Sequence, residues 1–500
     1  MKRSFSILII ILLTFFCGLS ASASSIGSAT TESYENLLST DDITDFDKYL
    51  DLGLPLLVIT TDEGRDPTFE LAVKPDPGCI GTGTTNAEKL PGTIRRFEPD
   101  GTLTYSSGTY EKGVSGCTLK VRGNGSALRP KKPFKVKLQK KGDLLARGDE
   151  RFNDKNWVLL TDVGMHISLG FTVASFFESG WVPAYEYVNV IINNQFRGLY
   201  ILVEAIERNE KCRINVSKDG YIIENDCYWY AENGEYLPSV DLPKAGYTFK
   251  YPDFDELTPD SKAFIQSKID QLEKSFTEGG YGKYLDLDSY AAWILCHDLL
   301  GTHDGLGANR FLVLADNHPD TKFTMGPVWD LDTSEGIVEG FFHMHYTPYL
   351  SMAKMFLGED KSLETVYTNL WINKGGKIYN QIVTEFKRLL KEGNHNFDIS
   401  AEYSNEVWAP QNAAEIDPWE SNIKRKLDYY AKKKIWLDQN VGQSLDVSVD
   451  EIEDDSFDAD ALVYSINGML VGTYSDFLGS GAEKGIYIVR GKNKTRKIII

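Results

Sequence analysis

The chain has 500 residues and a formal net charge of −19 at pH 7, and 42% of its residues are hydrophobic. This length exceeds the roughly 100–200 residues of one typical domain, so we expect one large domain with appendages or two domains. The hydrophobic fraction excludes global disorder, and the acidic balance excludes general nucleic-acid binding, because no domain-wide positive field would neutralise phosphates.

The N-terminus has the pattern of a secretory signal peptide. Lys2 and Arg3 precede an apolar run over residues 7–16, and the small residues Ala21-Ser22-Ala23 follow. This order predicts that residues 1–23 are removed and that the mature protein is secreted or lies at the outer cell surface. The alternatives are a membrane anchor, for which the run is shorter than the about 20 apolar residues needed, and a lipoprotein attached at Cys17. No later stretch is long enough to span a membrane, so we expect no transmembrane segment in the mature chain.

Five cysteines remain after that cleavage, and their spacing matches no zinc pattern. An odd number leaves at least one free thiol. A Cys79–Cys117 or a Cys212–Cys227 bridge is compatible with an oxidising compartment, but the sequence does not decide the pairing.

The main domain is expected over residues 51–440, after a polar lead-in at residues 24–50. Its first half has strand patterns, including period-two alternation over residues 133–138. Two apolar strands joined at Asn193-Asn194 predict a hairpin over residues 187–204. The other elements expected in this half are strands over residues 54–61, 69–74, 93–97, 117–122 and 220–224, and a helix over residues 157–179.

The second half of the domain is mainly helical in pattern. Residues 261–276 and 286–300 have apolar residues at helix spacing behind capping candidates, and helices dominate over residues 363–437. Between them, residues 310–314 and 322–329 predict a pair of strands. Strands followed by helices within one unit predict an α+β fold with two lobes.

An acidic linker and a small module complete the sequence. The linker covers residues 441–460, and its part from residue 446 onward contains eight acidic residues and no Lys or Arg, which is typical of a solvated segment. Residues 461–500 have strand patterns and predict a small all-β module.

The first candidate site is a basic segment from Lys120 to Arg147, with ten Lys or Arg residues and one acidic residue. Here a strand leads into a loop that contains Arg122, Asn124 and Ser126, separated by two glycines. Glycine lets backbone N–H groups approach an anion and the basic side chains supply charge, so this loop predicts phosphate binding. The alternative is a solvated basic edge strand, because Lys commonly protects sheet edges.

The second candidate is a Gly-rich loop over residues 301–309, between a predicted helix and a predicted strand. Asp304 precedes Asn309 by the spacing found in the protein-kinase catalytic loop. An Asp there can orient an attacking hydroxyl, and the Asn can hold a metal ion on a nucleotide phosphate. A simple turn is the alternative, because Asp, Gly and Asn are common turn residues.

The third candidate is Asp330 with Asp332, at the end of the next predicted strand. Two carboxylates two residues apart share one face of an extended segment, and Mg²⁺ typically takes one or two carboxylates plus substrate phosphates. A capping or turn role is the alternative. A basic strand, an Asp–Asn loop and a strand-end Asp follow one another in the order seen in kinases.

Five segments together resemble the CotH kinase family, over about residues 54–437. They are LKVRGNGSALRPKKPFKVKL, NWVLL, YVNVIINNQFRGLYILVE, GYIIEND and GPVWDLDTSEG. The resemblance implies an atypical kinase fold with a β-rich N-lobe and a helical C-lobe. It also implies transfer of the γ-phosphoryl group of ATP to protein Ser or Thr, with Mg²⁺ or Mn²⁺ as the metal.

Carried over by position, the resemblance makes Asp304 the catalytic Asp, Asn309 its metal-binding partner and Asp330 the second metal-binding residue. It places Arg122 in the RGN motif of the family. It also implies that a lysine of the following strand contacts the phosphates.

That lysine is Lys135 or Lys137, and strand alternation puts both on one face, so the choice stays open. Glu204 and Glu224 are further family-like acids, either of which could pair with the lysine or lie at the hinge between the lobes. As a departure, the chain has residues 164–166 (Gly-Met-His) where the family usually has an Arg.

The C-terminal module resembles the sorting domain of type IX secretion substrates, which implies the secretion machinery as a partner. Residues 484–497 contain six basic residues and no acidic ones, which fits a recognition surface. The alternative is a small β-module that only decorates the enzyme.

Two other functions are alternatives to the kinase hypothesis. One is a non-catalytic surface or coat-like binding protein on a kinase-like scaffold, which need not bind nucleotide or metal. The other is a metal-assisted hydrolase or glycosidase that uses Asp304, Asp330 and Asp332, for which sugar release without nucleotide is the test.

Overall fold

The computed structural model describes residues 43–75, 79, 81–240, 245–302, 309–341, 354–441, 461–465, 470–479, 486–490 and 495–499. The expected signal peptide, most of the lead-in and the acidic linker from residue 442 onward lie outside these described residues.

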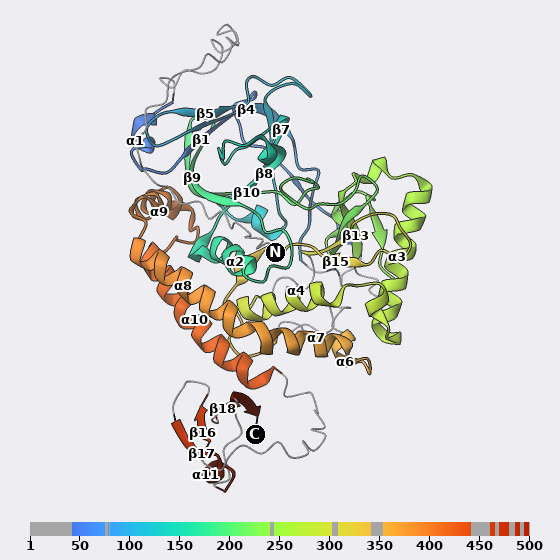
Figure 1. Ribbon diagram of the computed structural model, residues 1–500. Helices are drawn as coiled ribbons and strands as arrows, with labels where there is room; N and C mark the ends of the chain where they lie inside the picture. Colours follow the sequence, from blue (N-terminus) through green and yellow to red (C-terminus); the bar gives the residue numbers. More distant parts are fainter. Residues whose placement is uncertain are drawn as a thin grey trace, which may run out of the picture.

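A closed seven-stranded β-barrel forms the first half of the main domain, in the upper part of Figure 1. The strand order is β1-β9-β10-β8-β7-β6-β4, and β4 pairs back with β1 to close the sheet. Only the β1–β9 pair among these neighbours is parallel. The barrel strands are β1 (Leu56–Thr61), β4 (Leu90–Phe97), β6 (Cys117–Val121), β7 (Phe134–Gly142), β8 (Asp154–Leu160), β9 (Tyr185–Ile192) and β10 (Gln195–Glu204).

The short strands beside the barrel are β5 (Leu103–Ser106), which extends the sheet from β4, and the pair β2 (Glu70–Leu71) with β3 (Thr84–Thr85). Closure of the sheet corrects the expected layout of two kinase-like lobes, although the α+β class is confirmed. Sequence patterns locate strands but not their partners, and here β4 finds a second partner in β1.

The strand β8 explains one wrong prediction. Trp157 and Leu159 belong to the cluster inside the barrel, whereas Val158 and Leu160 pack against the helical half of the domain. An apolar run without alternation is typical of a strand buried on both faces as well as of a buried helix. The helix expected from residue 157 therefore begins only with α2 (His166–Ser175).

The barrel closes tightly at Gly92, which pairs with β1 and β6 at once. A Cβ atom at this position would overlap the carbonyl oxygen of Thr60. We expect Gly92→Ala to lower the free energy of unfolding by about 2 kcal/mol or more, because the two strands must separate to fit a methyl group. Urea unfolding measures this, with Gly376→Ala as the control, since a Cβ there meets no atom within 4 Å. Equal losses in both variants would contradict the close approach.

The second half of the domain contains a five-stranded antiparallel sheet and most of the helices. In Figure 1 this sheet lies beside α3, while α8 and α10 run below α2. The sheet order is β12-β13-β11-β14-β15, from β11 (Tyr221–Asp226), β12 (Tyr236–Pro238), β13 (Gly246–Tyr251), β14 (Arg310–Leu314) and β15 (Phe323–Met325). The helices are α3 (Pro259–Glu278), α4 (Leu287–Leu300), α6 (Lys354–Leu357), α7 (Ser362–Leu370), α8 (Gly376–Glu392), α9 (His395–Trp408) and α10 (Trp419–Asn440), with a π-helical turn (Trp371–Gly375) between α7 and α8.

Several local predictions for this half are confirmed. Asp286 caps α4 by accepting a hydrogen bond of 2.8 Å from the Ser289 backbone N–H. The expected helix over residues 261–276 is α3, and the expected strand over residues 310–314 is β14. The strand expected over residues 322–329 is shorter and ends at Met325, so Asp330 lies in the following loop and Asp332 lies in the 3₁₀ turn η9 (Leu331–Thr333).

Two smaller units complete the described structure. The end of the lead-in forms α1 (Phe46–Leu50), and Tyr49 there stacks on Phe196 of β10 with ring centroids 4.1 Å apart. The described C-terminal residues form a four-stranded antiparallel sheet in the order β17-β16-β18-β19. The strands of this sheet are β16 (Leu462–Ser465), β17 (Leu470–Thr473), β18 (Ile486–Arg490) and β19 (Thr495–Ile499). The helix α11 (Tyr474–Gly479) follows β17, so the expected all-β module is corrected to four strands with one short helix.

All five described cysteines are free thiols, so neither of the two bridges considered from the sequence is formed. Cys117 is fully buried inside the barrel, whereas Cys227 directly follows β11. None of the helices in the described ranges is long and apolar enough to cross a membrane.

Candidate functional site

A pocket lies between the barrel and the helical half of the domain. The loop after β6 contributes Arg122, Ser126 and Arg129, and the segment after β15 contributes Asp330 and Asp332. The pocket thus brings Arg122 and Ser126 of the first candidate site together with Asp330 and Asp332 of the third. Its other lining residues are Pro133, Leu160, Thr161, Ile167, Phe171 and Trp329.

The basic loop is held in place from behind. Asn124 accepts a hydrogen bond of 3.0 Å from the Thr84 backbone N–H, and the Thr84 hydroxyl donates to the Gly123 carbonyl at 2.8 Å. Asn124 does not line the pocket, so the structure assigns it a role in holding the loop. Arg122 does line the pocket, and its guanidinium carbon is 6.0 Å from the centroid of the Trp329 ring.

Asn309 and Asp330 meet on the acidic side of the site. The Asn309 side-chain amide donates to Asp330 Oδ2 at 3.1 Å, and the Asn309 backbone N–H donates to Glu224 Oε1 at 2.8 Å. Both residues have left-handed backbone conformations, with φ of 64° for Asn309 and 59° for Asp330. Such conformations are uncommon outside glycine and gather at functional sites, where the surrounding structure holds them.

Asp304, the expected catalytic residue, lies outside the described residues, but both ends of its loop are described. At one end, the Thr302 hydroxyl is 2.6 Å from His297 Nδ1, and burial lowers the pKa of His297 to about 3, so this histidine is neutral at neutral pH. Gly301 ends α4 with φ of 63°, and a Cβ there would overlap the Tyr429 hydroxyl. Asn309 is the other described end of the loop. One end is therefore held by the buried contact between Thr302 and His297, and the other by the contact between Asn309 and Asp330.

Asp332 forms an ion pair with Arg129, which lies on the opposite, basic side of the pocket. Its Oδ2 atom is 3.0 Å from Nη2 of Arg129, and its Oδ1 atom is buried without a hydrogen-bond partner in the described part of the chain. The sequence assigned Asp332 to metal binding and gave no partner to Arg129.

Lys135 and Lys137 both lie on the outer face of β7, as alternation predicts, and neither lines the pocket. Lys135 is paired in register with Lys120 of β6 and is half-buried, whereas Lys137 is exposed. Burial, reinforced by the nearby charge of Lys120, lowers the pKa of Lys135 to about 8. An ammonium group of this kind gains from a bound anion, which favours Lys135 of the two.

Glu224 connects Lys250, whose charge also acts on Lys135, to Asn309 on the acidic side of the site. It forms an ion pair of 2.8 Å with Lys250 of β13, and the same carboxylate accepts the Asn309 backbone N–H. The other family-like acid, Glu204, is paired instead with Arg147 at 2.9 Å. Sequence reasoning missed Lys250, because no motif surrounds it, and it missed the partner of Arg129 because only folding brings that partner near.

The donor atoms of the site fit a hard divalent cation. Asp330 and Asp332 offer carboxylate oxygens, one of them the unpartnered Oδ1 atom, and Asn309 offers an amide oxygen. No group of three or more His, Cys, Asp or Glu side chains suited to a metal ion occurs among the described residues. Oxygens of water or of a bound ligand can complete the coordination shell, as is usual for Mg²⁺.

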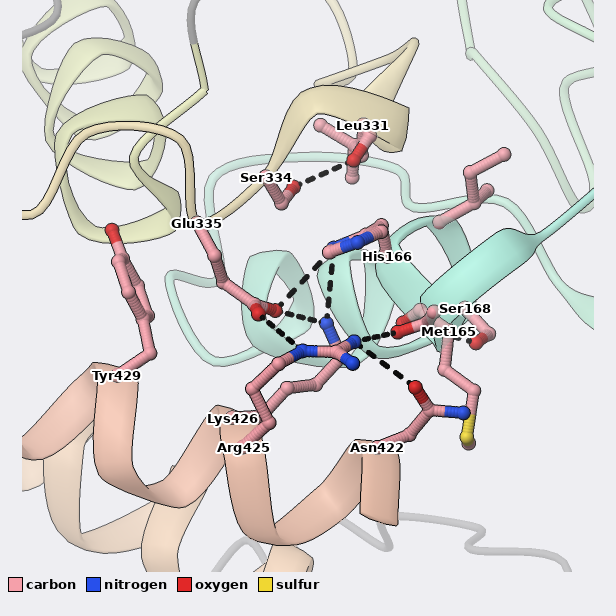
Figure 2. A network of polar contacts seen from close by, with 12 residues as sticks. Met165, His166, Ser168, Leu331, Ser334, Glu335, Asn422, Arg425, Lys426 and Tyr429 are labelled. Atoms are coloured by element: carbon pink, nitrogen blue, oxygen red, sulfur yellow. Dashed lines mark hydrogen bonds and ion pairs between the residues drawn. The ribbon is translucent and has the colours of Figure 1, made fainter. Parts of the chain in front are cut away.

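An ionic network connects α10 to Glu335, which follows Asp330 and Asp332 in the chain (Figure 2). Glu335 pairs with Lys426, and it also contacts Nδ1 of His166 and Nε of Arg425, each at 3.4 Å. Arg425 donates further to the Gly164 carbonyl at 3.0 Å. The network thus joins α10 both to Glu335 and to the turn before α2. Burial alone would raise the pKa of Glu335, but the His166 hydrogen bond and the Lys426 charge hold it at about 2.

The family model described as CotH kinase protein matches residues 119–454, from β6 to beyond α10, and so includes both sides of the pocket. No curated protein matches the chain.

Proposed function

Because the chain belongs to the CotH kinase family, we propose that it transfers the γ-phosphoryl group of ATP to Ser or Thr of a protein substrate. The observation that carries the proposal is the pocket in which Arg122 and Ser126 of the basic loop face Asp330 and Asp332. Phosphoryl transfer depends on positioning and charge stabilisation, and this pocket combines cationic groups with oxygen donors.

The residues divide into three roles in the proposed reaction. Asp304 accepts the proton of the substrate hydroxyl, whose oxygen then bonds to the γ-phosphorus while the bond from that phosphorus to the departing ADP oxygen breaks. Arg122 and Ser126 hold the phosphate oxygens in the pocket, and Lys135, which does not line the pocket, is proposed as a further phosphate contact from the outer face of β7. Asn309 and Asp330 hold the metal ion, with Asp332 beside them. When bound, Mg²⁺ or Mn²⁺ neutralises charge that develops on the phosphates.

Secretion or attachment at the outer cell surface belongs to the same proposal. It is supported by the signal-peptide pattern of residues 1–23 and by the sorting-like pattern of residues 461–500. The protein substrate would then be extracellular or at the cell surface, and the C-terminal module would be read by the secretion machinery.

The test is incubation of the purified chain with γ-labelled ATP, Mg²⁺ or Mn²⁺ and a mixed protein acceptor. We expect label on Ser or Thr with the natural sequence and a loss of at least about 10²-fold with Asp304→Ala, because the hydroxyl is no longer oriented or deprotonated. Asp320→Ala is the matched control, since Asp320 is an exposed carboxylate in the turn between β14 and β15. It should leave the transfer unchanged.

If the natural sequence transfers no label and calorimetry detects no metal-dependent ATP binding, the kinase proposal is wrong. The chain would then be a non-catalytic surface protein on a kinase-like scaffold.

A further inference from the structure

Arg129 and Asp332 connect the two sides of the pocket through their side chains alone. Arg129 follows η3 (Gly125–Leu128) on the barrel, and Asp332 lies in the 3₁₀ turn η9 (Leu331–Thr333) that comes after β15. Their ion pair of 3.0 Å is partly open to solvent, with 54% of the Arg129 side chain and 21% of the Asp332 side chain exposed. Ion pairs this exposed contribute little to stability, so this contact can be exchanged for another at small cost.

The backbone of Arg129 is fixed although its side chain is not buried. The Arg129 N–H donates to the Ser126 carbonyl at 3.2 Å, and Lys132 Nζ donates to the Ala127 carbonyl at 2.9 Å and to the Arg129 carbonyl at 3.3 Å. A change of partner therefore requires only a rotation of the Arg129 side chain, with no movement of the loop.

The charges in the pocket are arranged for such an exchange. Arg122 and Arg129 face Asp330 and Asp332, and all four line the same pocket. A metal–nucleotide complex carries both signs of charge. Its cation binds carboxylates, and its phosphates bind guanidinium groups. The orphan Oδ1 atom of Asp332 shows that Arg129 satisfies only half of this carboxylate.

We propose that Arg129 is a phosphate-binding residue which Asp332 holds in the ligand-free protein and releases when a metal–nucleotide complex enters. Asp332 turns to the cation, and Arg129 turns to a phosphate oxygen, where its planar group can donate two hydrogen bonds. The inference rests on the proposed function, because it specifies how the same pocket receives ATP. Arg129 thereby joins Arg122 and Ser126 in one phosphate subsite.

The test is a pair of binding measurements on the full chain, with Mn²⁺ alone followed by electron paramagnetic resonance and with Mn²⁺·ATP followed by calorimetry. Arg129→Gln should raise the affinity for Mn²⁺ alone by about threefold, because Asp332 is released from its ion pair. The same variant should lower the affinity for Mn²⁺·ATP by about tenfold or more, because a charged hydrogen bond to phosphate is lost.

Arg151→Gln is the matched control. Arg151 also lies on the barrel, pairs with a nearby Asp and has 51% of its side chain exposed, but it does not line the pocket. This control removes the same charge and should change both affinities by less than about twofold.

A double-mutant cycle separates release of Asp332 from the general loss of a positive charge. In an Asp332→Asn background, Arg129→Gln should no longer raise the affinity for Mn²⁺. If the gain persists there, or if Arg129→Gln moves both affinities in one direction or neither, the exchange is wrong while ATP binding itself stands. If the natural sequence binds no Mn²⁺·ATP, the proposed function fails and the exchange falls with it.

Discussion

Asp330→Asn should lower metal-dependent phosphoryl transfer by about 10³-fold or more and leave the fold intact. Asparagine has the shape of aspartate and tolerates the left-handed conformation that residue 330 adopts, with φ of 59°. It lacks the negative charge that holds a cation on the nucleotide phosphates. Charge stabilisation by a catalytic metal is worth several kcal/mol, and about 4 kcal/mol corresponds to a 10³-fold change in rate.

The measurement is transfer of label from γ-labelled ATP, together with thermal unfolding of the same preparations. Asp332→Asn is the matched variant, because it removes a carboxylate from the same pocket. Asp330 contacts Asn309, the other metal-holding residue, whereas Asp332 stands only beside this pair, so we expect a loss of only about tenfold from this substitution. A larger loss in Asp332→Asn than in Asp330→Asn would reverse the metal-binding roles assigned here.

Glu335→Gln should lower the free energy of unfolding by about 3–5 kcal/mol at neutral pH. Glu335 and Lys426 are almost fully enclosed, with 8% and 1% of their side chains exposed. Removal of one partner of a buried ion pair leaves the other charge uncompensated in a poorly solvated place. The loss should appear in urea unfolding, and it should be smaller in the double variant Glu335→Gln with Lys426→Met, which leaves no lone charge.

The control for Glu335→Gln is Asp428→Asn on α10. Asp428 also pairs with a lysine of that helix, Lys432, but both side chains are more than half exposed. Its replacement should change stability by less than about 1 kcal/mol. Equal losses in the two variants would mean that burial of the Glu335 network does not set its contribution.

The same network gives a pH dependence with a defined sign. The pKa of Glu335 is about 2 in the folded protein and 4.5 is its ordinary value, so the folded state favours the ionised form. This stabilisation is complete above pH 4.5 and is lost as the pH falls toward 2, by on the order of 3 kcal/mol. In Glu335→Gln, that part of the acid destabilisation should be absent.

Local features of the fold were predictable because they depend on short-range chemistry. The hairpin at Asn193-Asn194 was found because asparagine tolerates the left-handed conformation, and both residues indeed have positive φ. The strand over residues 157–160 was missed because its two faces are buried by different parts of the molecule, which removes the alternation. Barrel closure was missed for a similar reason, since it depends on the distant β1–β4 and β1–β9 pairs.

The candidate site shows the same division. The sequence proposed Arg122, Ser126 and Asp330 as site residues from residue types and order, and in the structure these three residues line one pocket. The sequence grouped Asn124 with them, because a side-chain amide in a Gly-rich loop can form hydrogen bonds either to a ligand or to the protein around the loop. Only the contact with Thr84 separates these two uses. The partner of Arg129 depends on how two halves of a long chain face each other, which no local pattern encodes.

The pairing of β1 with β9 also determines the order in which this chain can fold. Residues 56–59 must wait for residues 189–192 before that ladder can form, so much of the chain has to be synthesised first. Contacts between such distant segments carry a large loop-closure entropy and make folding slow. Until the ring of strands is complete, β1 and β9 present unpaired backbone edges to other chains. Truncated or stalled forms that end before residue 192 should therefore associate with one another, whereas the finished barrel exposes neither edge.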